Sequence, residues 1–199
     1  MLPKLIAQGD QSVEPITLAQ AQLHLRLDLE AGQHPDDSLV SALITVARQD
    51  AENYTGLALT QQTFVAYYDE FPTDDLDLGI WPVRSITSVQ YVDSDGNTQT
   101  FSSTAYRLDP NDKPAVLQYV DAWPQTKAQK NAVTVTFVAG YAAGSPTRWN
   151  LPKPIYQAML MMIGHLYENR ESVNVGNMVT AYPLGMMHLL TPYRIKMGI

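Results

Sequence analysis

The sequence predicts an α+β fold in which a helical core, built from an N-terminal helix pair and a long C-terminal helix, carries an inserted antiparallel β-rich region. Apolar residues recur at helical spacing over residues 17–56 and again after residue 153. Short segments rich in Thr, Val and Tyr lie between them. Because these strands do not alternate with helices, the pattern favours α+β over a parallel βαβ sheet. We therefore predict a helical core of residues 1–60 and 145–199 and a β-rich subdomain of residues 61–144.

The first helix is predicted from its start signal. Thr17 is a good N-cap residue, and Gln20 stands three positions later, as in a capping box. Leu18, Ala21 and Leu25 then share one helical face. The segment from Thr17 onward is therefore expected to begin a helix with one apolar side.

The second helix is expected to start near Asp36, after a polar loop. An apolar stripe at helical spacing follows, made of Leu39, Val40, Leu43, Ile44, Ala47, Ala51 and Tyr54. Gly56 is a plausible C′ residue, because glycine readily adopts the left-handed conformation that ends helices. Residues 17–56 are thus predicted to be a helical pair.

After Gly56 the residue pattern changes from one typical of helices to one typical of strands. Val, Thr and aromatic residues favour strands, and they dominate the segments 60–72, 80–92, 98–103, 115–120 and 131–141. Residues 93–97, with the sequence DSDGN, are predicted to form the turn of a hairpin. Pro82 is expected at an edge or a bulge, because proline lacks the backbone N–H. The acid-rich loop from Asp69 to Asp77 is expected to be solvated.

A long helix is predicted from about Pro154 to Arg170. It carries one apolar stripe made of Ile155, Ala158, Met159, Met162, Ile163 and Leu166, and a second made of Tyr156, Leu160, Gly164 and Tyr167. A lone amphipathic helix needs one stripe. Two stripes fit a helix that packs inward on its own core and outward on another subunit; alternatively, the helix is buried entirely within one subunit. A short helical segment is possible before Pro192.

Composition excludes several classes of protein. The 199 residues are 45% hydrophobic, which is enough to bury a core. The sequence has no cysteine, which excludes disulfides and thiolate chemistry. We expect no secretory signal, and no apolar run reaches the about 18–20 residues of a membrane span. A membrane role is therefore not expected.

Charge is distributed unevenly along the chain. The net charge is −7, but residues 1–121 hold 18 acidic and 6 basic residues, whereas residues 122–199 hold 2 acidic and 7 basic residues. These segments therefore carry −12 and +5. Such asymmetry can mark a partner surface, or it can reflect an acidic surface that keeps the protein in solution.

No motif indicates catalysis or a cofactor. The four histidines, His24, His34, His165 and His188, show no zinc-binding spacing. His165 and Glu168 are three apart, which indicates a surface pair. The DSDGN segment lacks the remaining ligands of a calcium loop, and no phosphate-binding loop, G-x-S-x-G or dinucleotide motif is present. We expect no catalytic residues, no metal and no cofactor, so an enzyme is not predicted.

Four stretches together carry a resemblance to a known family. They are ITLAQAQLHLRLD, LITVARQDAENYTG, PVRSITSVQYVDSDGNTQTF with YRLD, and VTVTFVAGY with LPKPIYQAMLMMIGHLYENRE. In this order they resemble the tailed-phage head–tail connector proteins, also called adaptor or head-completion proteins. The resemblance covers roughly residues 14–195 and includes the closing LLTPYRI.

The resemblance implies a structural protein of a phage or prophage. Such connectors form a ring under the portal protein, twelve-fold in the virion, which extends the DNA channel and docks a tail-side stopper or tail-completion protein. The expected location is the virion head–tail junction, and the bacterial host cytoplasm during assembly. DNA would pass without tight sequence-specific binding.

Candidate residues follow from the resemblance and the charge pattern. The candidates for an oligomer or portal interface are Tyr156, Leu160, Gly164, Tyr167, Glu168, Arg170 and Glu52. The candidates for lining the channel are Arg148, Lys153, Arg194 and Lys196. Arg170 is predicted either to favour the helix dipole or to pair with a carboxylate on another element, with Glu52 as the possible partner. The alternative function is a DNA-contacting regulatory or packaging factor that uses the basic C-terminal segment.

Overall fold

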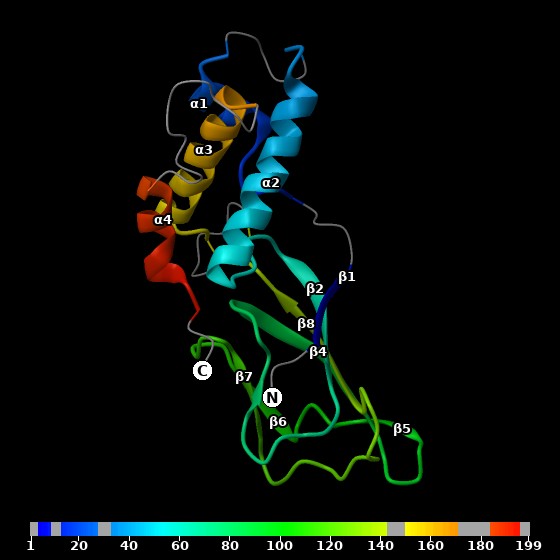
Figure 1. Cartoon of the computed structure of the whole chain (residues 1–199). Helices are drawn as coiled ribbons and strands as arrows, with labels where there is room; N and C mark the ends of the chain where they lie inside the picture. The colour runs from blue at the N-terminus through cyan, green and yellow to red at the C-terminus, as the bar shows by residue number, and fades with distance from the viewer. Residues whose placement is uncertain (1–3, 9–12, 28–32, 143–149, 171–183, 196–199) are drawn as a thin grey trace. The chain divides into compact units, whose positions relative to one another are not determined.

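The computed structural model describes residues 4–8, 13–27, 33–142, 150–170 and 184–195. The chain divides into two compact units. The helical unit comprises residues 13–59 and 142–194, and the β unit comprises residues 1–12, 60–141 and 195–199. Figure 1 shows helices in the first unit and strands in the second, which confirms the predicted α+β class.

The helical unit contains four α-helices, α1 (Leu18–Leu25), α2 (Asp37–Thr55), α3 (Lys153–Glu168) and α4 (Leu184–Leu190), followed by the 3-10 helix η1 (Thr191–Tyr193). The capping box at α1 is confirmed. The Gln20 backbone N–H donates to Thr17 Oγ1 at 3.2 Å, and the Thr17 N–H donates to Gln20 Oε1 at 2.9 Å. These bonds satisfy two donors that the helix start would otherwise leave unpaired.

The end of α2 is also set by local sequence. Gly56 has a φ of 74° and donates its N–H to the Glu52 carbonyl at 2.8 Å. A residue with a Cβ is strained in this left-handed conformation, so glycine suits the position. The predicted C-terminal glycine of the helix is confirmed.

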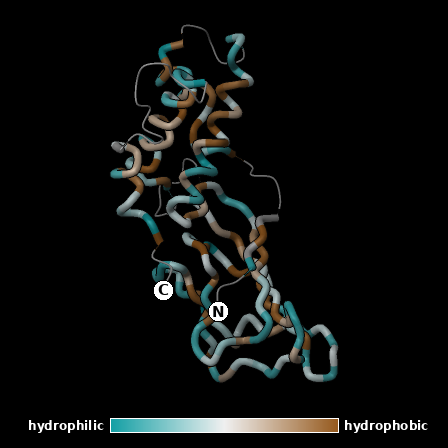
Figure 2. Tube along the Cα trace, in the orientation of Figure 1, coloured by the Kyte–Doolittle hydropathy of each residue, from teal (hydrophilic) through white to brown (hydrophobic). Residues whose placement is uncertain are grey.

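The core of the helical unit forms where α3 packs against α2, α4 and α1. In Figure 1 the α2 and α3 helices run side by side, and hydrophobic residues recur along both (Figure 2). From α3 the fully buried residues include Ile155, Met159 and Ile163, and from α2 they include Val40 and Ala47. Burial of each large apolar side chain contributes about 1.5–3 kcal/mol, so this packing dominates the stability of the unit.

The β unit contains two antiparallel sheets. The five-stranded sheet has the order β1-β2-β8-β4-β5, with β1 (Lys4–Gln8), β2 (Gln62–Tyr68), β8 (Val133–Ala139), β4 (Val83–Val92) and β5 (Thr98–Thr100). The three-stranded sheet has the order β3-β7-β6, with β3 (Leu76–Asp77), β7 (Val116–Tyr119) and β6 (Tyr106–Asp109).

The central strand β8 shows why the larger sheet forms. Its side chains alternate between buried and half-buried positions, and Phe137 stacks on Phe64 of β2 with ring centroids 5.9 Å apart. Gly140 follows β8 with a φ of 109°, and a Cβ there would lie 1.8 Å from the Thr60 carbonyl oxygen. Glycine is therefore required where β8 ends.

Three strands were not predicted. The strands β1, β3 and β6 are short and lack a long apolar pattern. The strands β1 and β3 pair with strands distant in sequence, whereas β6 pairs with β7, the next strand along the chain. The strand β1 lies in a segment that we assigned to the helical core, but it pairs with β2 and belongs to the β unit. Pro82 immediately precedes β4, whose pairing with β8 shifts register directly afterwards, between Val83 and Ser85.

Candidate functional site

The helix α3 is covered by its own chain along nearly all of the first predicted apolar stripe and along part of the second. Leu160, from the second stripe, is only 7% exposed. A Cβ added to Gly164 would lie 3.4 Å from Nε2 of His24, on α1. Tyr156 and Tyr167 are half-buried, whereas Glu168 is exposed. Leu160 is therefore a core residue of this subunit, whereas Tyr156, Gly164 and Tyr167 of the same stripe stay partly accessible.

The end of α3 forms a compact polar cluster with the residue before α2. Asp36 Oδ2 accepts a hydrogen bond from the Tyr167 hydroxyl at 2.7 Å and from Arg170 Nη2 at 2.8 Å. The Arg170 guanidinium also lies 4.6 Å from the centroid of the Tyr167 ring. The hydrogen bond from Tyr167 and the charge of Arg170 lower the pKa of Asp36. We call these three residues the Asp36 cluster.

The predicted pairing of Arg170 with Glu52 is wrong, because its carboxylate partner is Asp36. Asp36 was predicted only as the start of the second helix. Hydrogen bonds beside the cluster also connect α1 to the start of α2. The Asp37 carboxylate accepts one from the Gln22 side chain and one from the His34 backbone N–H. The ends of α1, α2 and α3 are therefore held together at this cluster.

Glu52 instead belongs to an internal ion-pair network. Arg48 is fully buried, and its guanidinium contacts Glu14 Oε2 at 2.8 Å and Glu52 Oε2 at 2.5 Å. Glu52 Oε1 also accepts the Leu59 backbone N–H at 2.8 Å. Burial raises the pKa of Glu52, although the hydrogen bond from Leu59 and the charge of Arg48 oppose this effect. The four-residue spacing of Arg48 and Glu52, which brings them together on one side of a helix, is the sequence signal that could have predicted this pair.

Two of the predicted channel residues lie on the described surface of the helical unit. Lys153 Nζ lies 5.6 Å from the centroid of the Tyr156 ring, and the Arg194 guanidinium lies 5.5 Å from that of Tyr54. Both cations are exposed, and each makes a cation–π contact with a neighbouring aromatic ring. The other two candidates, Arg148 and Lys196, fall outside the described residues.

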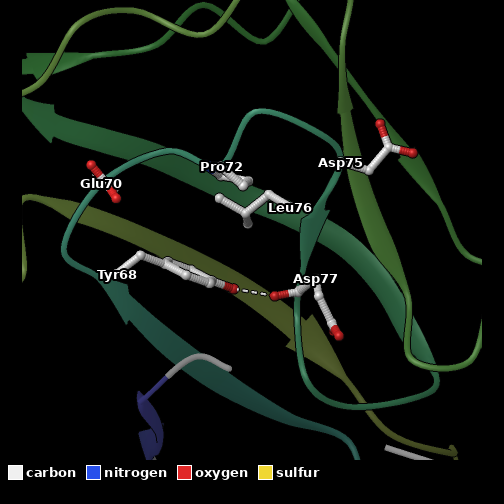
Figure 3. A pocket seen from close by; sticks show the side chains of 6 residues that line it. All are labelled: Tyr68, Glu70, Pro72, Asp75, Leu76 and Asp77. Atoms are coloured by element: carbon white, nitrogen blue, oxygen red, sulfur yellow. Dashed lines mark hydrogen bonds between the residues drawn. The ribbon is translucent and has the colours of Figure 1, made fainter. Parts of the chain in front are cut away.

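The acid-rich loop of the β unit borders a small pocket, which is lined by Tyr68, Glu70, Pro72, Asp75, Leu76 and Asp77. Figure 3 shows the Tyr68 hydroxyl directed at the Asp77 backbone oxygen, to which it donates at 2.6 Å. Burial raises the pKa of Tyr68 and that of the Asp77 carboxyl. The Asp75 carboxylate accepts a hydrogen bond from Gln118 at 2.9 Å. These side chains are thus engaged in holding the loop.

An aromatic cluster holds the same loop from another side. It consists of Phe71, Tyr91, Phe101, Tyr106, Tyr119 and Trp123. The Phe71 and Trp123 rings stack with centroids 4.7 Å apart, and the Trp123 indole N–H donates to the Asp74 carbonyl at 3.0 Å. The loop is therefore fixed by rings and hydrogen bonds, while its residues Glu70, Asp74 and Asp75 remain exposed, as expected for a solvated acidic loop. The sequence feature that could have predicted this cluster is the concentration of aromatic residues in four separate segments.

Neither a metal-binding cluster nor a membrane-spanning helix is found among the described residues. Within those residues, no group of three or more His, Asp or Glu side chains is placed to hold a metal ion. Over the same part of the chain, no helix has the length and apolar character to cross a membrane.

Comparison with known proteins gives matches in structure. No protein-family model matches the sequence, and no curated protein matches it. A chain in the virion of the native gene transfer agent particle is 22% identical with a TM-score of 0.78, and the match covers 98% of this chain and 97% of that chain. A chain in the neck of the empty particle, computed with C6 symmetry, is 23% identical with a TM-score of 0.79 and the same coverage.

A third match comes from the neck of the native particle, computed with C12 symmetry. Its TM-score is 0.74 at 22% identity, and the match covers 100% of this chain and 98% of that chain. All three matches extend over nearly the whole of both chains. The likeness therefore concerns the complete fold, both the helical unit and the β unit.

Proposed function

We propose that this chain is a structural connector at the head–tail junction of a phage or phage-like particle. One observation carries the proposal: the fold matches, over 97–98% of their length, chains found in the virion and neck of a gene transfer agent particle. The order of the sequence stretches that resemble head–tail connectors supports the same function independently. A connector needs stable surfaces rather than a catalytic centre, so the proposed role is not enzymatic.

The proposal includes a ring of copies, twelve-fold in the virion. The matched necks were computed with C6 and C12 symmetry, which supports this subunit number. The ring would lie under the portal protein and receive a tail-side stopper or tail-completion protein. Assembly would take place in the bacterial host cytoplasm. We propose that the helical unit, predicted as residues 1–60 and 145–199 and found as residues 13–59 and 142–194, is the connector core. The β unit, predicted as residues 61–144, is proposed as its inserted subdomain.

The contact residues are proposed from the described surface. Glu168 is exposed at the end of α3, and Arg170 remains about half-exposed beside Asp36. Together with the accessible edges of Tyr156 and Tyr167, they are the remaining interface candidates of α3 for the portal or a neighbouring copy. Lys153 and Arg194, with Arg148 and Lys196, are proposed to face the DNA channel.

Gene deletion combined with labelling tests the function. In cells that produce the particles, loss of the chain should give heads without attached tails. A C-terminally tagged copy should restore tailed particles, and gold-labelled antibody should mark the head–tail junction. Normal tailed particles formed without the chain, or label confined to heads or tail tips, would show that the proposal is wrong.

A further inference from the structure

The helix α2 has an unusual distribution of charge, and the structure describes its whole length. A surface helix ordinarily directs its charged residues toward solvent. The exposed residues of α2 are instead all uncharged: Ser38, Ser41, Ala42, Val46, Gln49 and Asn53. At 100° per residue these positions fall on one side of the helix. We call them the neutral face of α2.

The charged residues of the same helix are used inside the chain. Arg48 is fully buried between Glu14 and Glu52, and Asp37 accepts a hydrogen bond from Gln22 of α1. Asp50 is partly buried. Burying a charge is costly unless the charge is paired. The neutral face therefore does not arise from a shortage of charged residues, because α2 contains four and presents none of them on its exposed side.

A second feature lies on α1. Leu23 is 81% exposed, which makes it the most exposed large apolar side chain among the described residues. Val46, on the neutral face of α2, is 45% exposed. A single exposed leucine is ordinary. Leu23 gains significance because the same unit also presents an uncharged helical face with an exposed apolar side chain, Val46.

We propose that the neutral face of α2 is the docking surface for Leu23 of a second copy of this chain. This inference rests on the proposed function, which requires many copies in contact. Copies of a protein with a net charge of −7 repel one another. A contact between them is favoured where no acidic side chains face one another. The neutral face of α2 exposes no charged residue, and the exposed residues beside Leu23, which are His24 and Arg26, are basic rather than acidic.

The contact joins two different surfaces, so it is head-to-tail. Each copy presents Leu23 to one neighbour and its neutral face to the other. Contacts of this kind close into a ring when the rotation between neighbours equals a full turn divided by a whole number of copies. Short side chains such as Ser41 and Ala42 beside Val46 also allow a neighbouring helix to approach closely, because interaxial distance depends on the side chains at the contact.

Cysteine cross-linking tests the contact directly, because the natural sequence has no cysteine. The test variant carries Leu23→Cys and Val46→Cys in one chain. Oxidation of the assembled protein should produce a ladder of covalent multimers larger than dimers on a non-reducing gel. Neither single variant should produce the ladder. A matched control, Gln157→Cys with Val46→Cys, pairs an exposed position of α3 with the same face and should remain monomeric on the gel.

Charge substitution provides a second readout. Leu23→Glu and Val46→Glu should each reduce the assembled fraction at least tenfold in sedimentation, with unchanged circular dichroism because both positions are exposed. The combination Leu23→Lys with Val46→Glu should recover part of the assembly, since opposite charges then meet across the contact. Equal loss in the combined variant would argue against direct contact and overturn the proposal.

The cross-linking reaction is run on the isolated protein and on purified particles, which separates the two hypotheses. If particles contain the chain at the junction but the double variant forms no ladder, this contact is wrong and the connector function stands. Efficient dimers from Leu23→Cys alone would indicate a symmetric contact and also overturn it. A ladder from the isolated protein, with the chain absent from particles, would support the contact and contradict the connector function.

Discussion

At the scale of single residues, Arg48 is the side chain whose loss should cost most. It is fully buried, and its partners Glu14 and Glu52 come from different parts of the helical unit. Arg48→Leu would leave two carboxylates without their cation. Breaking a buried pair in this way costs about 3–5 kcal/mol, and the lower end is expected because Glu14 is partly exposed.

Urea unfolding followed by circular dichroism measures this loss for Arg48→Leu. The matched control is Arg84→Leu, an arginine of the β unit whose contact with Gln61 is exposed. Its effect should stay below about 1 kcal/mol, as for most surface contacts. A loss below that value for Arg48→Leu as well would mean that the network contributes little to stability.

The Asp36 cluster gives a residue-scale prediction about pH. Hydrogen bonding from Tyr167 and the charge of Arg170 lower the folded-state pKa of Asp36. Its contribution is therefore fully present above the unfolded value of about 3.9 and is lost as the pH falls through the folded-state pKa. Thermal melts of the wild type and of Asp36→Asn should differ at pH 7. The difference should shrink below about pH 4, and a constant difference across this range would contradict the assignment.

At the scale of elements, α3 distinguishes a core helix from an interface helix. Leu160 is buried by its own subunit, whereas Tyr156 is half-buried near the first turn. Leu160→Asp should unfold the helical unit, because a buried unpaired charge costs several kcal/mol. Tyr156→Asp should leave the chain folded. Circular dichroism and size-exclusion chromatography compare the two, and a folded monomer from Leu160→Asp would restore the original interface expectation.

At the scale of the whole molecule, electrostatics governs the encounter with DNA. The net charge is −7, Arg170 pairs with Asp36, and Arg194 and Lys153 each lie over an aromatic ring. The net negative charge opposes the approach of phosphates, so counterion release from the exposed cations should give only weak, salt-sensitive binding. We expect no tight, sequence-specific duplex binding, which also suits a channel that DNA must slide through.

Fluorescence anisotropy with two unrelated duplexes tests this expectation at about 0.15 M salt. The two binding curves should be equally weak and should weaken further with added salt. A dissociation constant below about 1 µM for one duplex alone would favour the alternative, a DNA-contacting regulatory or packaging factor. The variant Lys153→Gln with Arg194→Gln would then show whether the proposed channel residues are responsible.

The sequence by itself determined the features that depend on neighbouring residues. The capping box joins Thr17 and Gln20, the left-handed Gly56 ends α2, and residues 93–97 form the predicted hairpin turn between β4 and β5. Each depends on backbone groups a few positions apart, so its energy can be estimated from a short segment. The apolar stripes likewise predicted the long helices and the α+β class, because burial follows the period of each element.

Only the tertiary structure decided which distant groups meet. Arg170 bonds Asp36 across 134 positions, and Arg48 bonds Glu14 across 34. For each of these arginines the sequence contains several possible carboxylate partners, and sequence alone does not indicate which of them forms the pair. The choice depends on how α1, α2 and α3 pack, because this packing brings only certain groups within hydrogen-bond distance. The same packing buried Leu160 and left Leu23 and the neutral face of α2 in solvent, although helical periodicity alone placed Leu160 on the outward stripe.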